Sequence, residues 1–123
     1  MKINYDETAQ FKRDFKKLLK KFPTLKDDFA TNKQYRIELF HCQEVDSNSI
    51  FEIEGASNAD NLKFYKVKKF QCKSLKGRGA KSGIRVIYAY LGSDQRIVFL
   101  EIYFKADQAN EKRERIVEFI NET

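Results

Sequence analysis

Apolar residues recur at helical spacing near the start of the chain. Between residues 6 and 22 they fall three or four positions apart, and lysines crowd the opposite side. The residues of this apolar face are Phe11, Phe15, Leu18, Leu19 and Phe22. We therefore predict an amphipathic helix over residues 6–22. It should end at Pro23, because the residue before a proline disfavours the helical conformation.

A second helix is expected directly after this proline. Thr24 and Asp27 have the spacing of a capping box, in which two side chains cap the first helical turn. An apolar stripe follows, and Arg36 interrupts its middle. The members of the stripe are Leu25, Phe29, Leu39 and Phe40. The very short turn between the two segments predicts a pair of antiparallel helices.

The helical period is lost between residues 46 and 61, where Ser, Asn and Asp are frequent. This segment is predicted to be a loop with one short strand at residues 50–53. Three further strands are expected over residues 64–72, 84–91 and 96–105, which are rich in β-branched and aromatic residues. A connector over residues 73–83 and a turn over residues 92–94 separate these strands.

The last of these strands has the clearest alternation. One face is predicted to hold Val98, Leu100, Ile102 and Phe104, and the other Phe99, Glu101, Tyr103 and Lys105. A final helix, capped by Asp107 or Asn110, should follow. Its expected apolar face consists of Ile116, Val117, Phe119 and Ile120. The order helix, helix, strand, strand, strand, helix makes this an α+β protein, and its 123 residues predict one domain over residues 1–123.

Charge adds a class of partner to this picture. The chain has 24 Lys and Arg against 18 Asp and Glu, so its formal charge is +6, which suits nucleic acid or an acidic protein segment. It lacks an apolar run of the roughly 20 residues that span a membrane, and we expect a cytoplasmic protein with no membrane partner. Cys42 and Cys72 are then expected to be thiols. Neither a metal-ligand spacing nor a nucleotide-binding glycine motif is present, so no metal or cofactor is predicted.

Basic residues cluster in the second half of the chain, with no acidic residue between them. The cluster consists of Lys66, Lys68, Lys69, Lys73, Lys76, Arg78, Lys81 and Arg85. Phosphates are attracted to such a surface through Coulomb energy and counterion release, so it is a candidate RNA-binding surface. The alternative is a solvated strand edge on which lysines prevent aggregation.

The expected hairpin adds candidate chemistry. Arg85 is out of phase with its apolar neighbours, so it should project from the sheet face opposite the helices, and Glu101, Tyr103 and Lys105 share that face in the predicted alternation. Such a face could bind and cleave RNA, with cations on the phosphate and a Tyr or Glu to move a proton or stack a base. A surface ion pair and a half-buried tyrosine are the alternative. The sole histidine, His41, is interpreted as a packing or surface residue of a helix rather than a catalytic one.

These segments resemble a known family. The chain resembles the RelE/ParE toxin superfamily in four segments: residues 75–78, 83–88 and 101–105, and the basic amphipathic segment 11–18. The resemblance implies a helical hairpin packed on a small, mainly antiparallel sheet with a C-terminal helix. It also implies the toxin of a type II toxin-antitoxin system, bound by a cognate antitoxin. RelE-like members cleave mRNA on the ribosome without a metal, and ParE-like members inhibit DNA gyrase.

The resemblance also implies roles for particular residues. The strand arginine that contacts the phosphate in RelE-like nucleases falls on Arg85, and the basic residue after the last strand falls on Lys105. Tyr103 is the candidate for stacking or proton transfer. The remaining basic residues, Lys66, Lys68, Lys73, Lys76, Arg78 and Lys81, are assigned to RNA binding.

The chain departs from the nuclease pattern at two points. Ala106 stands where several nucleases have an arginine, and no tyrosine follows Tyr103. Three functions therefore stay open: an mRNA endoribonuclease, a ParE-like gyrase inhibitor without enzymatic activity, and a degenerate module that only binds a partner.

Overall fold

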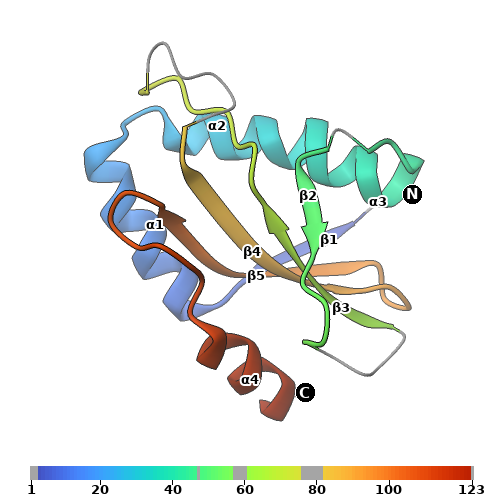
Figure 1. Ribbon diagram of the computed structural model, residues 1–123. Helices are drawn as coiled ribbons and strands as arrows, with labels where there is room; N and C mark the ends of the chain where they lie inside the picture. Colours follow the sequence, from blue (N-terminus) through green and yellow to red (C-terminus); the bar gives the residue numbers. More distant parts are fainter. Residues whose placement is uncertain (1–2, 47, 57–60, 76–81, 123) are drawn as a thin grey trace.

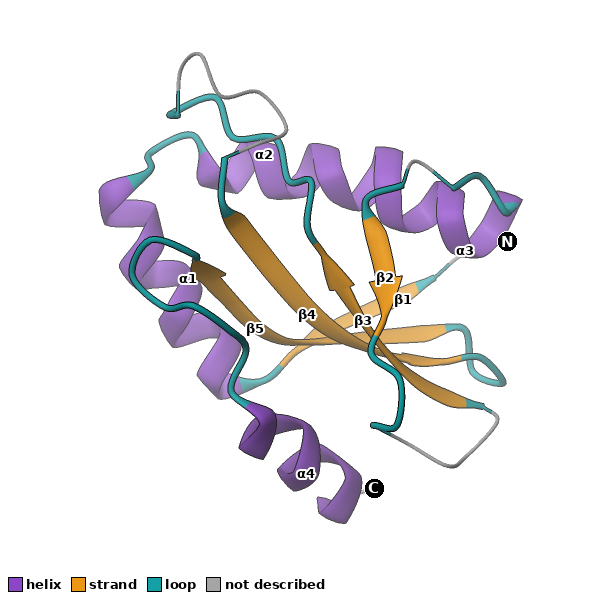
Figure 2. Ribbon diagram, in the orientation of Figure 1, coloured by secondary structure: helices purple, strands orange, loops and turns teal. Residues whose placement is uncertain are grey.

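The computed structural model describes residues 3–46, 48–56, 61–75 and 82–122. Their strands form a five-stranded mixed sheet in the order β1-β5-β4-β3-β2, covered by helices (Figures 1 and 2). β1 (Asn4–Glu7) pairs parallel to β5 (Arg96–Phe104), and the other pairings, through β4 (Ile84–Leu91), β3 (Leu62–Val67) and β2 (Ile50–Glu52), are antiparallel. The α+β class is thus confirmed.

The first helix begins later than its apolar pattern predicts. Residues 4–7 form β1, and α1 (Ala9–Lys21) follows after Thr8, whose hydroxyl accepts a hydrogen bond from the Phe11 backbone N–H at 3.1 Å. This is a conventional N-cap, and it fixes the start of the helix. The predicted start at residue 6 was wrong because the polar segment before Thr8 pairs with the sheet instead.

The second helix is one long helical run with an irregular centre. It comprises α2 (Leu25–Asn32), a π-helical segment η1 (Lys33–Glu38) and α3 (Leu39–Gln43). The predicted capping box does not form: the Thr24 hydroxyl donates to the Asp28 carboxylate at 2.6 Å and accepts from the Ser74 backbone N–H at 2.9 Å, so it caps no N–H of the helix. The chain changes direction sharply between α1 and α2, and the α2–α3 run then extends across the sheet (Figure 1). The first two helices are therefore not the predicted antiparallel pair.

Aromatic packing holds α1 and α2 against one face of the sheet. Phe11 and Phe29 lie 5.5 and 4.9 Å from Phe99, measured between ring centroids, and all three side chains are buried. Large aromatic rings bury much apolar area and favour such tilted arrangements. Ile84, Val86 and Tyr88 of β4 belong to the same core, which we call the helical face of the sheet.

The opposite face has a second, smaller core. It is formed by residues such as Phe64, Ile87 and Leu100, and Ile116 of α4 (Arg113–Glu122) packs on it. The predicted caps Asp107 and Asn110 lie in the connector over residues 105–112, before the helix begins. Only Ile116 and Phe119 of the expected apolar face are covered, whereas Val117 and Ile120 are exposed.

Two strand predictions need correction. β3 ends at Val67 rather than at residue 72, because the chain beyond it turns toward α2, where the buried Asn32 amide donates to the Gln71 carbonyl at 3.1 Å. In β5 the register with β4 shifts between Ile87 and Tyr88, which leaves Leu100 as an extra residue. Such a bulge reverses the alternation. Val98 and Leu100 therefore lie on the α4 side, whereas Ile102 and Phe104 lie on the helical face.

Candidate functional site

Three basic side chains come together on the sheet face opposite α1 and α2. Val86 and Val67 belong to the helical-face core, so their neighbours Arg85 and Lys66 point to the other side. Arg85 also bonds to the backbone of Lys68, and Lys66 and Lys68 line one groove. We call Lys66, Lys68 and Arg85 the cationic face.

Arg85 is held in place by backbone carbonyls. Its Nη1 donates to the Lys68 carbonyl at 2.6 Å and more weakly to that of Ile84 at 3.4 Å. Both bonds use the same nitrogen. Among the described residues, the other guanidinium nitrogens of Arg85 have no hydrogen-bond partner. A half-buried, pre-positioned guanidinium with free donors is suited to a phosphate oxygen pair.

Lys66 is engaged by an acidic residue from the connector. Its ammonium lies 2.8 Å from the Glu111 carboxylate, and both side chains are largely buried. Burial alone would lower the pKa of Lys66, but the hydrogen bond to Glu111 raises it above its ordinary value. Burial likewise opposes ionisation of Glu111, yet the bond to Lys66 leaves the pKa of that carboxyl below its ordinary value. The pair is therefore fully charged at neutral pH.

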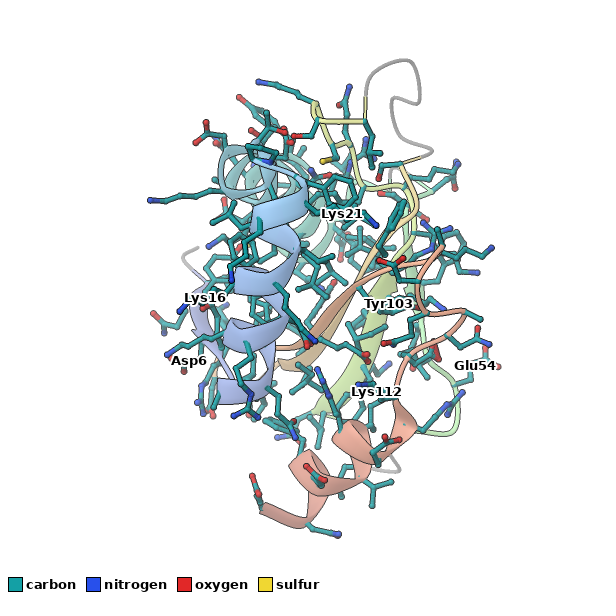
Figure 3. The ribbon with its side chains drawn as sticks, turned by 90° about the vertical axis from the view of Figure 1, so that its left-hand side faces the viewer. Asp6, Lys16, Lys21, Glu54, Tyr103 and Lys112 are labelled. Carbon is teal, nitrogen blue, oxygen red and sulfur yellow. The ribbon has the colours of Figure 1, made fainter. Side chains whose placement is uncertain are left out.

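Tyr103 is more deeply buried than a residue that stacks on a base should be. It lies opposite Arg85 in the β4–β5 register, beneath the connector that leads to α4 (Figure 3). Its side chain is only 4% exposed, so in this state it offers no open ring face to a base. Its hydroxyl has no hydrogen-bond partner within the described residues, and burial raises its pKa. The phenol is thus protonated at neutral pH, and a role for it in proton transfer stays a prediction.

A buried carboxylate of β5, that of Glu101, holds the connector over residues 105–112 against the sheet. Glu101 is 1% exposed and accepts hydrogen bonds from the Gln108 side chain at 2.6 Å and the Lys112 backbone N–H at 2.9 Å. Glu101 and Tyr103 do share one side of the sheet, as predicted, but that side is not open there, because residues 105–112 fold back over it. Arg115 of α4 adds an ion pair with Asp14 of α1, which fastens the helix after the connector.

The remaining predicted residues are not all gathered at the cationic face. Lys105 is exposed just beyond β5, and its backbone N–H donates to Gly83 at 2.8 Å. Lys73 lies beside α2, where its backbone N–H donates to Asp28 at 2.9 Å. Lys76, Arg78 and Lys81 lie outside the described residues.

His41 is a packing residue, as predicted. It lies on the helical face, with its ring stacked on Tyr90 at a centroid distance of 4.0 Å and its Nε2 2.7 Å from the Tyr88 hydroxyl. Burial lowers its pKa to about 4. It is on the other side of the sheet from Arg85 and therefore cannot serve chemistry at the cationic face.

The described ranges contain no group of three or more His, Cys, Asp and Glu side chains that could hold a metal ion. Cys42 and Cys72 are not joined in a disulfide. No helix among the described residues has both the length and the apolar character needed to cross a membrane.

Two residues of this region were missed by the sequence analysis. Phe51 and Glu111 both line the groove beside Lys66 and Lys68, which has a volume of about 390 Å³. Phe51 had a usable signal, since the strand predicted at residues 50–53 puts it on the opposite face from Ile50. Glu111 had none, because only the path of the connector brings it to Lys66.

The fold can now be compared with known proteins. No model of a protein family matches the chain, and no curated protein matches it in sequence. Among solved structures, the archaeal RelE–RelB complex from Pyrococcus horikoshii OT3 contains a chain that matches with a TM-score of 0.52 and 16% sequence identity. The match covers 85% of this chain and 97% of that chain. The protein therefore has a RelE-like fold, as the resemblance in its sequence implied.

Proposed function

We propose that this protein is the toxin of a type II toxin-antitoxin system and cleaves mRNA at the ribosome without a metal. The observation that carries the proposal is the position of Arg85 on β4, bonded to the backbone of Lys68 and on the same face as Lys66, opposite α1 and α2 in a RelE-like fold. Arginine recognises a phosphate through paired N–H donors, and the two lysines supply further positive charge. A cognate antitoxin is the expected partner, by analogy with the RelB of the matching complex.

The chemistry suited to such a site is attack by an RNA 2′-hydroxyl on the adjacent phosphorus. A bond forms between O2′ and phosphorus, the bond to the 5′-oxygen breaks, and the proton of the 2′-hydroxyl is lost while the 5′-oxygen gains one. This reaction requires alignment of the strand and stabilisation of charge on the non-bridging oxygens. Arg85 and Lys68 are assigned to that charge, and Lys105, exposed just beyond β5, to a further phosphate contact.

A second candidate is a protein that acts only by binding, such as a gyrase inhibitor or a partner-binding module. Three observations favour it. Tyr103 is buried, Ala106 replaces an expected arginine, and no tyrosine follows Tyr103. Among the described residues, the cationic face thus lacks an exposed group that would serve as a general base at neutral pH.

Induced expression in a bacterium separates these functions. We expect growth arrest with new cuts in transcripts, and loss of both in Arg85→Ala. Arg13→Ala, which removes an exposed arginine of α1, is the matched control and should stay toxic. Arrest with intact transcripts would favour gyrase or another target, and no arrest would favour a binding module. A folded Arg85→Ala protein that still cut transcripts would contradict the assignment of Arg85.

A further inference from the structure

Phe51 is an exposed aromatic residue on the edge strand of the sheet. Its side chain is 41% exposed, although its neighbour Ile50 is buried in the helical-face core. Successive residues of a strand point to opposite faces, so Phe51 lies on the same side as the cationic face. A partly exposed aromatic ring beside basic groups is a candidate contact for a nucleic-acid base.

The surroundings of Phe51 are built from the cationic face itself. Phe51 is paired with Lys66 in the β2–β3 register, and the Lys68 ammonium lies 4.8 Å from the centroid of its ring. Both lysines and Phe51 line the groove of about 390 Å³, together with Ile53, Arg113 and the carboxylates Glu52, Glu54 and Glu111. The flat ring of Phe51 therefore adjoins two ammonium groups that can attract a phosphate, in a groove that also carries carboxylates.

Tyr103 and Tyr35 do not combine an exposed ring with a position beside the cationic face. Tyr103, on the same side of the sheet, is buried. Tyr35 is 60% exposed, but it belongs to η1 and lines a different groove with Asn32 and Arg36. Within the described part of the chain, Phe51 is the large exposed aromatic that adjoins Lys66 and Lys68.

We propose that Phe51 is a base-stacking residue for single-stranded RNA, next to a phosphate held by the cationic face. Proteins that bind single strands combine basic grooves with aromatic rings on which bases stack, and stacking is strong enough to matter for affinity. Lys68, which covers the ring in the free protein, would turn to the backbone phosphate when a base takes its place. This inference rests on the proposed function, since it adds a base contact to the same RNA site.

The test is binding of a labelled single-stranded RNA of about ten nucleotides, a length typical for such grooves. The strand carries 2′-O-methyl groups, so that it cannot be cleaved by 2′-hydroxyl attack. Fluorescence anisotropy compares wild type with Phe51→Leu, Phe51→Tyr and the matched control Tyr35→Leu. We expect Phe51→Leu to weaken binding about fivefold or more, whereas Phe51→Tyr and Tyr35→Leu stay within about twofold of wild type.

Abasic RNA strands identify the stacking partner. When the base at the position that contacts Phe51 is removed, wild type should bind the abasic strand more weakly than the intact strand. Phe51→Leu, which has already lost the stacking contact, should bind both strands equally well. If Phe51→Leu binds RNA as wild type does while Arg85→Ala binds weakly, the inference is overturned and the proposed function stands. If wild type binds no RNA, the inference about Phe51 and the proposed function both fail. Unchanged RNA binding with weakened antitoxin binding would overturn the inference and make the groove a protein-docking surface.

Discussion

The Glu111 carboxylate and the Lys66 ammonium are 2.8 Å apart, and they join the connector before α4 to the middle of β3. Glu111 also lies 3.9 Å from Arg113. Through this contact the protein places a negative group of its own on one of the three cations of the cationic face. A phosphate that binds Lys66 must compete with that carboxylate, so the pair sets the affinity of the face for anions.

Removal of this charge should strengthen RNA binding. We predict that Glu111→Gln raises affinity for the uncleavable RNA strand about two- to fivefold at low salt, because the neutral amide competes less well for the ammonium. The gain should shrink as salt is added, since phosphate contacts are salt-dependent. Glu122→Gln, which neutralises an exposed residue of α4, changes net charge equally and should have a smaller effect. Equal gains in both variants would show that only net charge matters.

His41 should make the protein less stable in mild acid. Its pKa is about 4 in the folded protein against an ordinary value of 6.5, so between these values only the unfolded chain takes up the proton. Stability from this group is complete above pH 6.5 and is lost as pH falls toward 4. The loss should be on the order of 2 kcal/mol, after allowance for the part of the ring that water reaches.

The check compares wild type with His41→Gln by urea unfolding. His41→Gln is expected to be less stable at pH 7, because Tyr88 loses its ring partner. Since the variant lacks the titrating group, the gap in free energy of unfolding should narrow on going to pH 5. A gap that stays constant over this range would mean that His41 has an ordinary pKa.

Gly83 should tolerate a methyl group poorly. It has a φ of +88°, and a Cβ at this position would lie 3.3 Å from the Phe104 ring. Gly55 has a similar φ of +74° with open space around it, so Gly55→Ala pays only for the backbone conformation, about 1 kcal/mol. Gly83→Ala should cost about 1 kcal/mol more, through the contact with Phe104. Thermal unfolding measures both, and equal costs would show that the ring moves aside freely.

The sequence predicted those elements that bury a regular apolar pattern. The strand at residues 84–91 has the predicted bounds, because its alternation packs Ile84, Val86 and Tyr88 on the helices. The helix over residues 9–21 was found for the same reason. By contrast, β1 is short and mostly exposed, so its residues have no apolar period to detect. It is a strand because β5 supplies the hydrogen bonds.

The candidate site was predictable only in part. Alternation along β4 gave the direction of Arg85, and it holds because β4 is regular there. The same reasoning failed for Phe99, because the extra residue at Leu100 shifts the alternation before Glu101. Glu101 lies on the predicted side, but the connector covers its carboxylate. Contacts between distant segments, such as Lys66 with Glu111, depend on the path of the whole chain, and local patterns contain no information about them.

The parallel pairing of Tyr5 with Ile97 joins two segments that lie far apart in the sequence. Contacts between such distant positions form slowly, because a long loop must close first. During translation, β1 therefore cannot pair until β5 has left the ribosome. Arg85 likewise lies opposite Tyr103 only after β5 has paired with β4. A nascent chain that stops short of β5 has no finished sheet on which to display its cations. On the proposed function, the protein cannot act on RNA until β5 has joined the sheet.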